Sequence, residues 1–191
     1  DESKLKSFKT GKEKSNTKIK AQIAKVLSLI SEAKRPVIIS GHGIRIAGAQ
    51  EQFLELVAKL KIPVLSTFNG FDLIPSDHPL YIGRIGTIGD RAGNFALQNS
   101  DLYISVGSRN NIRQVSYNWN AYARGAKKVV VDIDPEELKK ATLKPDLAIE
   151  ADAAEFIVFL KKELNKINLP DWSDWLGWCK VRKEKYPVVL K

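Results

Sequence analysis

The stretch "VIISGHGIRIAG", residues 37–48, decides the fold. Its first four residues, 37–40, form a short apolar run that predicts a buried strand. Two glycines, Gly41 and Gly43, follow at once, and the apolar spacing of residues 47–61 predicts an amphipathic helix. A strand, a glycine turn and a helix in this order are typical of a parallel α/β sheet.

The same alternation continues along the chain. Further strands are predicted at 63–67, 102–107, 128–134 and 147–151, and helices at 17–35, 91–100, 135–141 and 153–167. The strands are continuous apolar runs, as expected where helices cover both faces of a sheet. We therefore predict an α/β fold with a doubly wound, mostly parallel, Rossmann-like sheet and helices on both faces.

Three segments fall outside this regular pattern. Residues 1–16, rich in Lys, Ser and Glu, predict a flexible linker before the domain at 17–167. Residues 68–90 hold six Gly and Pro residues and predict a long loop. Residues 168–191 predict an amphipathic helix with aromatic side chains. Two placements of that helix are open: it docks on this domain, or it leads toward a further domain.

Composition narrows the class of protein. The chain has 191 residues, 43% hydrophobic and 28% charged, with a net charge of +9. This charge lies in residues 1–35 and 176–191 around a nearly neutral body, so no nucleic-acid partner is predicted and a basic nucleic-acid-binding module is the weaker alternative. No run approaches the roughly 18 apolar residues of a membrane span. The single cysteine, Cys179, fits a reducing, cytoplasmic location.

The first glycine turn carries half of a dinucleotide fingerprint. In G-x-G-x-x-G the third glycine position is Ile46 here, and the second strand ends in Ser66 and Thr67, where NAD-binding units have an acid. Three interpretations stay open: a phosphate or nucleotide site, a stand-alone NAD-binding α/β enzyme, and a tight turn without a ligand.

Two later strand ends offer polar side chains. Arg109 and Arg113, in "GSRNNIR", are spaced to clamp a diphosphate, or are surface arginines. Asp132 can accept a hydrogen bond from a ribose hydroxyl, whereas Asp134 and Asp152 are predicted to cap the helices that follow them.

Patterns typical of catalysis are missing from the sequence. The two histidines, His42 and His78, lie beside no evident nucleophile, and Cys179 lies in a helix that is predicted to be packed. We therefore predict no catalytic residue and no metal ligand in this chain.

Several segments follow one another in a specific order and spacing: "AKRPVIISGHGIR", "LKIPVLSTFNG", "PSDHPLYIGRIGTIGDRAGNFALQNSDLYISVGSR" and "KVVVDIDPEELKK". Together, over residues 17–167, they resemble the central domain of thiamine-diphosphate-dependent enzymes of the acetolactate synthase type. The resemblance implies a longer parent, a homodimer or homotetramer, whose other domains bind thiamine diphosphate and Mg²⁺. The parent would decarboxylate a 2-keto acid and join its product to an acceptor, and this domain alone would be inactive.

The resemblance also implies a nucleotide site, because this domain binds FAD in acetolactate synthases and ADP or nothing in other relatives. Four positions depart from the family pattern: His42 stands inside what is often a run of three glycines, Ile88 replaces a histidine, and Asn110 and Asn111 stand where the family has two acids. FAD, ADP and an empty cleft therefore all stay open. The matching positions are Gly41, His42, Gly43, Thr67, Phe68, Gly86, Thr87, Gly107, Ser108, Arg109, Arg113, Asp132, Ile133, Asp152 and Ala153.

Overall fold

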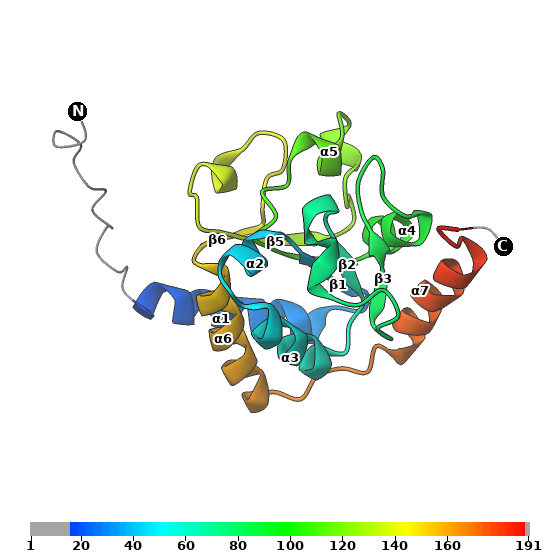
Figure 1. Cartoon of the computed structure of the whole chain (residues 1–191). Helices are drawn as coiled ribbons and strands as arrows, with labels where there is room; N and C mark the ends of the chain where they lie inside the picture. The colour runs from blue at the N-terminus through cyan, green and yellow to red at the C-terminus, as the bar shows by residue number, and fades with distance from the viewer. Residues whose placement is uncertain (1–15, 190–191) are drawn as a thin grey trace, which may run out of the picture.

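A parallel sheet forms the centre of the molecule. The computed structural model describes residues 16–189, and six strands within them form one sheet in the order β3-β2-β1-β4-β5-β6, all parallel (Figure 1). This order is that of a Rossmann-like fold and confirms the predicted fold class. The strands are β1 (Pro36–Ser40), β2 (Val64–Ser66), β3 (Tyr81–Arg84), β4 (Leu102–Val106), β5 (Lys127–Asp132) and β6 (Leu147–Glu150).

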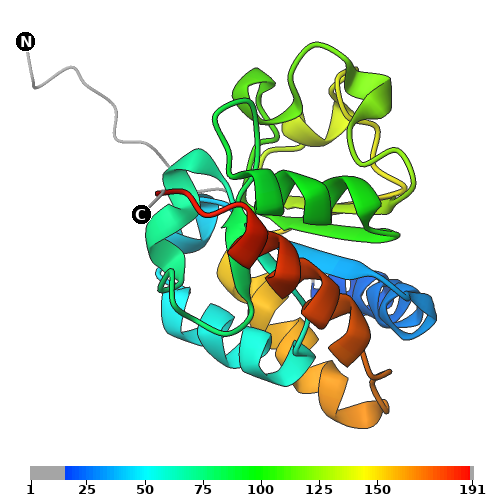
Figure 2. The same ribbon diagram turned by 90° about the vertical axis from the view of Figure 1, so that its right-hand side faces the viewer.

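Helices cover both faces of this sheet. The helices α1 (Asn16–Glu32), α3 (Gln50–Leu60) and α6 (Ala153–Glu163) pack together on one face, and α4 (Arg91–Asn99) lies on the other (Figure 2). The connection β1-α3-β2 crosses the sheet in one direction, and β3-α4-β4 crosses it in the opposite direction. Because such crossovers are right-handed, α3 and α4 must lie on opposite faces. Fully buried rings, Phe53 of α3 and Phe156 of α6, fill the space between helices and sheet.

The helix α7 (Ser173–Lys185) docks on this domain. It runs beside α4 and β3 (Figure 2). Trp172 Nε1 donates to the Ala33 carbonyl over 2.8 Å, and Trp175 Nε1 donates to the Pro36 carbonyl over 3.0 Å. Lys183 Nζ donates to the Tyr81 carbonyl on β3 over 2.7 Å. Since β3 is an edge strand, α7 covers main-chain groups that would otherwise be open to a foreign strand.

Three predicted segments differ in the structure. Residues 68–90 are not one loop, because they contain the 3-10 helix η2 (Phe68–Leu73) and the strand β3, which pairs with β2 through Tyr81, Gly83 and Arg84. The predicted helix 47–61 is present as α3, but it begins only at Gln50, after Gly48 with φ +66°, and a separate short helix, α2 (Gly43–Ile46), precedes it. The predicted helix 135–141 is only the 3-10 turn η4 (Glu137–Lys139).

The remaining elements are short. They are α5 (Ile112–Val115) and the 3-10 helices η3 (Trp119–Ala121) and η5 (Leu164–Lys166), the last of which ends the predicted helix 153–167. The flexible linker predicted at 1–16 lies outside the described residues except for Asn16, the first residue of α1.

Candidate functional site

A cleft of about 680 Å³ opens at the carboxyl ends of the strands. The chain leaves the neighbouring strands β1 and β4 toward opposite halves of the sheet, and the cleft spans this boundary. In open α/β sheets, ligands bind at such a switch point. Segments that follow all six strands contribute to the lining, so the fold brings together residues more than a hundred positions apart.

Most of the candidate residues meet in this cleft. Three of the fifteen, Gly41, Gly86 and Thr87, are not part of its lining. The twelve that line it are His42, Gly43, Thr67, Phe68, Gly107, Ser108, Arg109, Arg113, Asp132, Ile133, Asp152 and Ala153.

The glycines of the first turn are explained by the turn after β4. The Gly43 amide donates to the Gly107 carbonyl over 2.9 Å, and a Cβ on Gly43 would lie 2.8 Å from the Gly107 Cα. A Cβ on Gly41 would overlap the Gly107 carbonyl and the Ser108 Cα. Positions 41 and 43 therefore lack side chains because another backbone lies against them.

His42 is anchored at the mouth of the cleft. Its Nδ1 lies 2.9 Å from the Asn69 carbonyl oxygen. Since a carbonyl oxygen can only accept, Nδ1 carries the proton, and in the neutral ring Nε2 is left as an acceptor.

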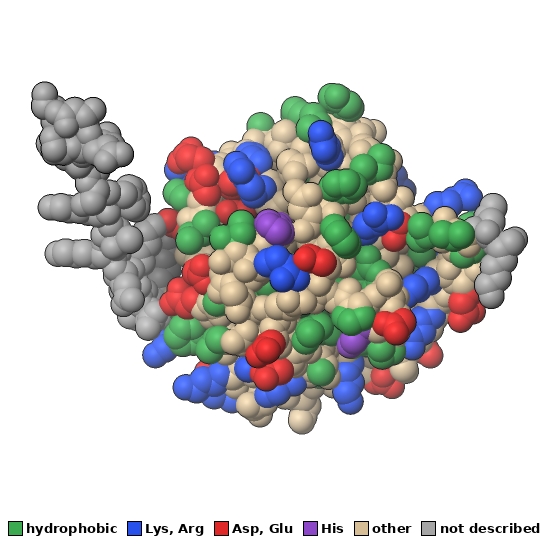
Figure 3. Space-filling model, in the orientation of Figure 1, with side chains coloured by type: hydrophobic (Ala, Val, Ile, Leu, Met, Phe, Trp, Pro, Cys, Tyr) green, Lys and Arg blue, Asp and Glu red, His purple; other side chains and the backbone are tan. Residues whose placement is uncertain are grey.

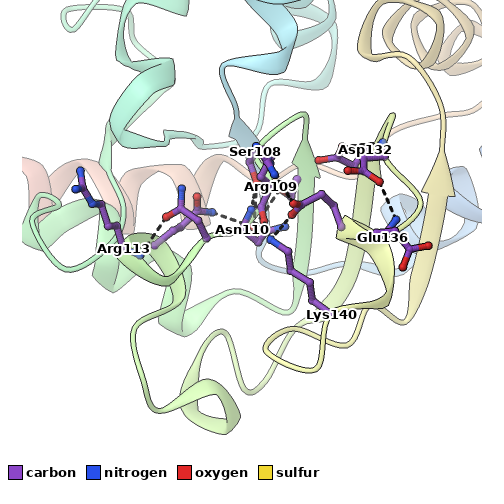
Figure 4. A network of polar contacts seen from close by, with 12 residues as sticks. Ser108, Arg109, Asn110, Arg113, Asp132, Glu136 and Lys140 are labelled. Carbon is purple, nitrogen blue, oxygen red and sulfur yellow. Dashed lines mark hydrogen bonds and ion pairs between the residues drawn. The ribbon is translucent and has the colours of Figure 1, made fainter.

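A buried network of hydrogen bonds centred on Asn110 holds the turn after β4 in place (Figure 4). Arg109 and Asn110 both adopt left-handed conformations, with φ of +57° and +41°. Asn110 Oδ1 accepts from the Tyr103 hydroxyl, from Ser108 Oγ over 3.0 Å and from Gln114 Nε2 over 3.0 Å. Burial raises the pKa of Tyr103, so its hydroxyl stays a donor.

The two arginines of this turn have different surroundings. Arg109 pairs with Glu137, which raises the pKa of the guanidinium. Within residues 16–189, the Arg113 guanidinium has no ion-pair partner, and it lies apart from Arg109 (Figure 4). The Arg113 carbonyl accepts from Thr87 N over 2.9 Å and from Thr87 Oγ1 over 3.0 Å. Thr87 thus supports the cleft without lining it.

Carboxylates stand at the carboxyl ends of β5 and β6. Asp132 is 6% exposed, and this burial raises its pKa while hydrogen bonds from the amides of Asp134 and Arg109 lower it. Asp134 Oδ1 accepts from the Glu136 amide over 2.9 Å, but the helix at 135–141 that Asp134 is predicted to cap is absent, since only a 3-10 turn with Glu136 at its N-cap follows. The predicted cap at Asp152 is confirmed, since its Oδ1 accepts from the Ala154 amide over 2.8 Å.

Apolar side chains form the rim of the cleft. Their exposed fractions run from 46% to 79%, and each comes from a different segment at the carboxyl end of the sheet. Sequence reasoning placed Phe68 and Ile133 at the site but did not place Ile46 or Ile112 there. The sequence feature that could have identified Ile46 and Ile112 is an apolar residue within a few positions of a strand end, because solvated loops are usually polar there. The rim consists of Ile46, Phe68, Ile88, Ile112 and Ile133.

Three further features concern metal binding, membrane insertion and the reactivity of the cysteine. Residues 16–189 contain no group of three His, Cys, Asp or Glu side chains placed to hold a metal ion. Nor do they contain a helix that is long and apolar enough to cross a membrane. Cys179 is fully buried, and this burial raises the pKa of its thiol to about 12. The thiol is therefore protonated at neutral pH, as an inert cysteine is.

Comparison with known proteins places this cleft in a family. The chain is 38% identical over 155 residues to a probable acetolactate synthase large subunit of Methanocaldococcus jannaschii, covering 81% of this chain and 26% of that protein. It is 38% identical over 170 residues to the acetolactate synthase large subunit of Lactococcus lactis, covering 89% and 29%. It is 35% identical over 170 residues to a glyoxylate carboligase of Escherichia coli O157:H7, covering 85% and 28%.

The chain thus spans between a quarter and a third of the length of these relatives. Residues 23–160 match the family described as thiamine pyrophosphate enzyme, central domain. That segment runs from α1 to α6 and contains the whole sheet and the whole cleft lining. The chain belongs to the family of thiamine pyrophosphate enzyme central domains.

Proposed function

We propose that this chain is the non-catalytic central domain of an acetolactate-synthase-like enzyme, and that its cleft binds FAD or ADP. The observation that carries the proposal is the combination, at one switch point, of an arginine turn, a buried carboxylate and an apolar rim. A nucleoside diphosphate needs these three surroundings for its phosphates, its ribose and its ring system. The cleft volume of about 680 Å³ lies within the usual range for small-ligand sites.

Each part of the cleft has one assigned role. Arg109 and Arg113 would hold the diphosphate through charge-assisted hydrogen bonds. Asp132 would accept from ribose hydroxyls, since its carboxylate lies at the end of β5 and lines the cleft. The rim residues would cover the faces of the rings. When bound, FAD would supply a redox-active ring and ADP would not, and we assign no redox step to this chain.

The reaction of the longer parent enzyme is inferred from the relatives of this domain. We propose that it decarboxylates a 2-keto acid and transfers the product to an acceptor, with thiamine diphosphate and Mg²⁺ bound by other domains. A cytoplasmic homodimer or homotetramer is the proposed assembly. The described residues of this chain would serve to hold the nucleotide and to connect those domains.

The two alternatives are less favoured. An NAD-binding unit would place an acid after β2, where this chain has Thr67. A nucleic-acid-binding module would present a basic face, whereas Lys, Arg, Asp and Glu side chains are intermingled on the face seen in Figure 3.

Ligand-dependent unfolding tests the proposal. The chain is heated with FAD, ADP, NAD or thiamine diphosphate in excess. A ligand at 100 times its Kd stabilises a protein by about 2.7 kcal/mol. We expect FAD or ADP to raise the midpoint temperature, and NAD and thiamine diphosphate to leave it unchanged. A flat result with both FAD and ADP would overturn the nucleotide assignment.

The variant Arg109→Ala tests the diphosphate clamp. Losing a charge-assisted hydrogen bond should weaken binding about tenfold. The matched control is Arg124→Ala, which removes an exposed arginine from the loop before β5, at the opposite end of the sheet. Equal affinities in these two variants would remove Arg109 from the site.

A further inference from the structure

We propose that Glu137 competes with the ligand's phosphates for Arg109, and that Lys140 keeps Glu137 paired when Arg109 is released. Glu137 then sets how strongly the cleft binds anions. This inference rests on the proposed nucleotide site and names a residue outside the cleft lining as the one that tunes it.

The arginine is committed to this carboxylate in the structure. Arg109 Nη2 lies 2.7 Å from Glu137 Oε1, and Arg109 Nε donates to the same oxygen over 3.1 Å. The Arg109 side chain is 70% exposed and lines the cleft, whereas the Glu137 side chain is 9% exposed. The cation is therefore the mobile partner, and the carboxylate is fixed beneath it.

A second cation, Lys140, lowers the free-energy cost of moving Arg109 from Glu137 to a ligand. Lys140 Nζ forms an ion pair with Glu137 Oε2 and also donates to the Arg109 carbonyl over 2.8 Å (Figure 4). Burial acts to raise the pKa of Glu137, but hydrogen bonds from Lys140 and Arg109 lower it below its ordinary value. If Arg109 turned toward a ligand, Lys140 would still neutralise Glu137. No buried carboxylate would be left unpaired, which is the costly outcome when one partner of an ion pair leaves.

The other charges near Arg109 do not replace this partner. Asp132 and Asp134 attract the guanidinium through charge alone, and both rank behind Glu137 in raising its pKa. A ligand diphosphate, with several charged oxygens, offers Arg109 acceptors for the two hydrogen bonds that it now makes to Glu137 Oε1. The same lysine contact to the Arg109 carbonyl holds the turn while the side chain changes partner.

The variant Glu137→Gln tests the competition in the whole chain. We expect the Kd for ADP to fall about two- to fivefold. This factor corresponds to the free energy of a partly exposed ion pair, because in the variant Arg109 no longer has to leave Glu137 to bind the ligand. The affinity for adenosine, measured as a competitor of ADP, should not change because adenosine has no phosphate. A weaker or unchanged affinity for ADP would overturn the inference, and so would a parallel change for adenosine.

A double-mutant cycle tests the role of Lys140. Lys140→Gln should weaken ADP binding in the wild-type background, since Glu137 then depends on Arg109 alone. In the Glu137→Gln background the same change should have no effect. An equal loss in both backgrounds would mean that Lys140 binds the phosphate directly, which overturns the exchange. If the wild-type chain binds no nucleotide, the proposed function falls together with this inference; if it binds and Glu137→Gln does not tighten binding, only the inference falls.

Discussion

Two turns meet at the centre of the cleft, and they are built in opposite ways. Residues 41–43 after β1 consist of glycines around His42, and their backbone packs directly on Gly107. Residues 107–113 after β4 carry polar side chains, and a buried network centred on Asn110 holds them. The first turn provides shape, and the second provides charge.

A glycine motif can indicate a type of fold or a ligand site, and this difference between the turns distinguishes the two. The spacing of Gly41 and Gly43 indicates a strand-turn-helix unit, and the structure accounts for both glycines without any ligand. The groups suited to a diphosphate come from the partner turn, which has a single glycine. A glycine fingerprint therefore identifies the fold more reliably than it identifies the residues that touch a ligand.

Gly41→Ala should break the contact between the turns and have the largest effect on stability. The new Cβ would meet backbone atoms of Gly107 and Ser108, which belong to a central strand connection and cannot move aside. We expect a loss of about 4 kcal/mol in the free energy of unfolding, or no folded protein. Chemical denaturation measures this loss.

Gly177→Ala is the matched control for that variant. Gly177 lies in α7, and a Cβ there would meet nothing within 4 Å. Alanine in a helix should add about 0.5–1 kcal/mol to the free energy of unfolding. If both alanine variants behaved alike, the packing explanation of the first turn would be wrong.

Asn110→Ala should weaken the second turn to a lesser degree. It removes the acceptor shared by Tyr103, Ser108 and Gln114, all buried, and should cost about 2–3 kcal/mol. The neighbouring Asn111→Ala removes only the cap on the Arg113 amide, at 3.0 Å, and should cost about 1 kcal/mol. Equal losses in thermal denaturation would show that the network does not support the turn.

Much of the fold follows from local patterns. The strands β1, β4, β5 and β6 are apolar runs, and α4 and α6 have regular apolar spacing, so their positions were predictable. The strand β3 was not predictable, because it has four residues including Gly83 and lies among prolines and glycines. Its strand conformation depends on pairing with β2 and on the cover that α7 provides, which are contacts between distant segments.

The candidate site divides in the same way. Strand-end residues such as Asp132 and Arg109 could be placed from the order of the elements alone. Asn110, Glu137 and Lys140 could not, because their roles depend on partners that only the folded loops bring together. Glu137 and Arg109 are 28 positions apart, and nothing in "PEELKK" indicates that its second glutamate faces another strand end.

Asp132→Asn probes a buried carboxylate that the backbone of the second turn contacts, and its effect should be the smallest. Burial raises the pKa of Asp132 above its ordinary value near 4, so the folded state retains the proton longer than the unfolded state. The stability that this group contributes is complete below the ordinary pKa and is lost as the pH rises through the raised one. The variant does not undergo this loss. The free energy of unfolding of the variant, minus that of the wild type, should therefore increase between pH 3.5 and 7, by less than about 1 kcal/mol. Urea titrations at several pH values measure the difference, and a difference that shrinks with rising pH would mean that the amides of Asp134 and Arg109 outweigh the effect of burial.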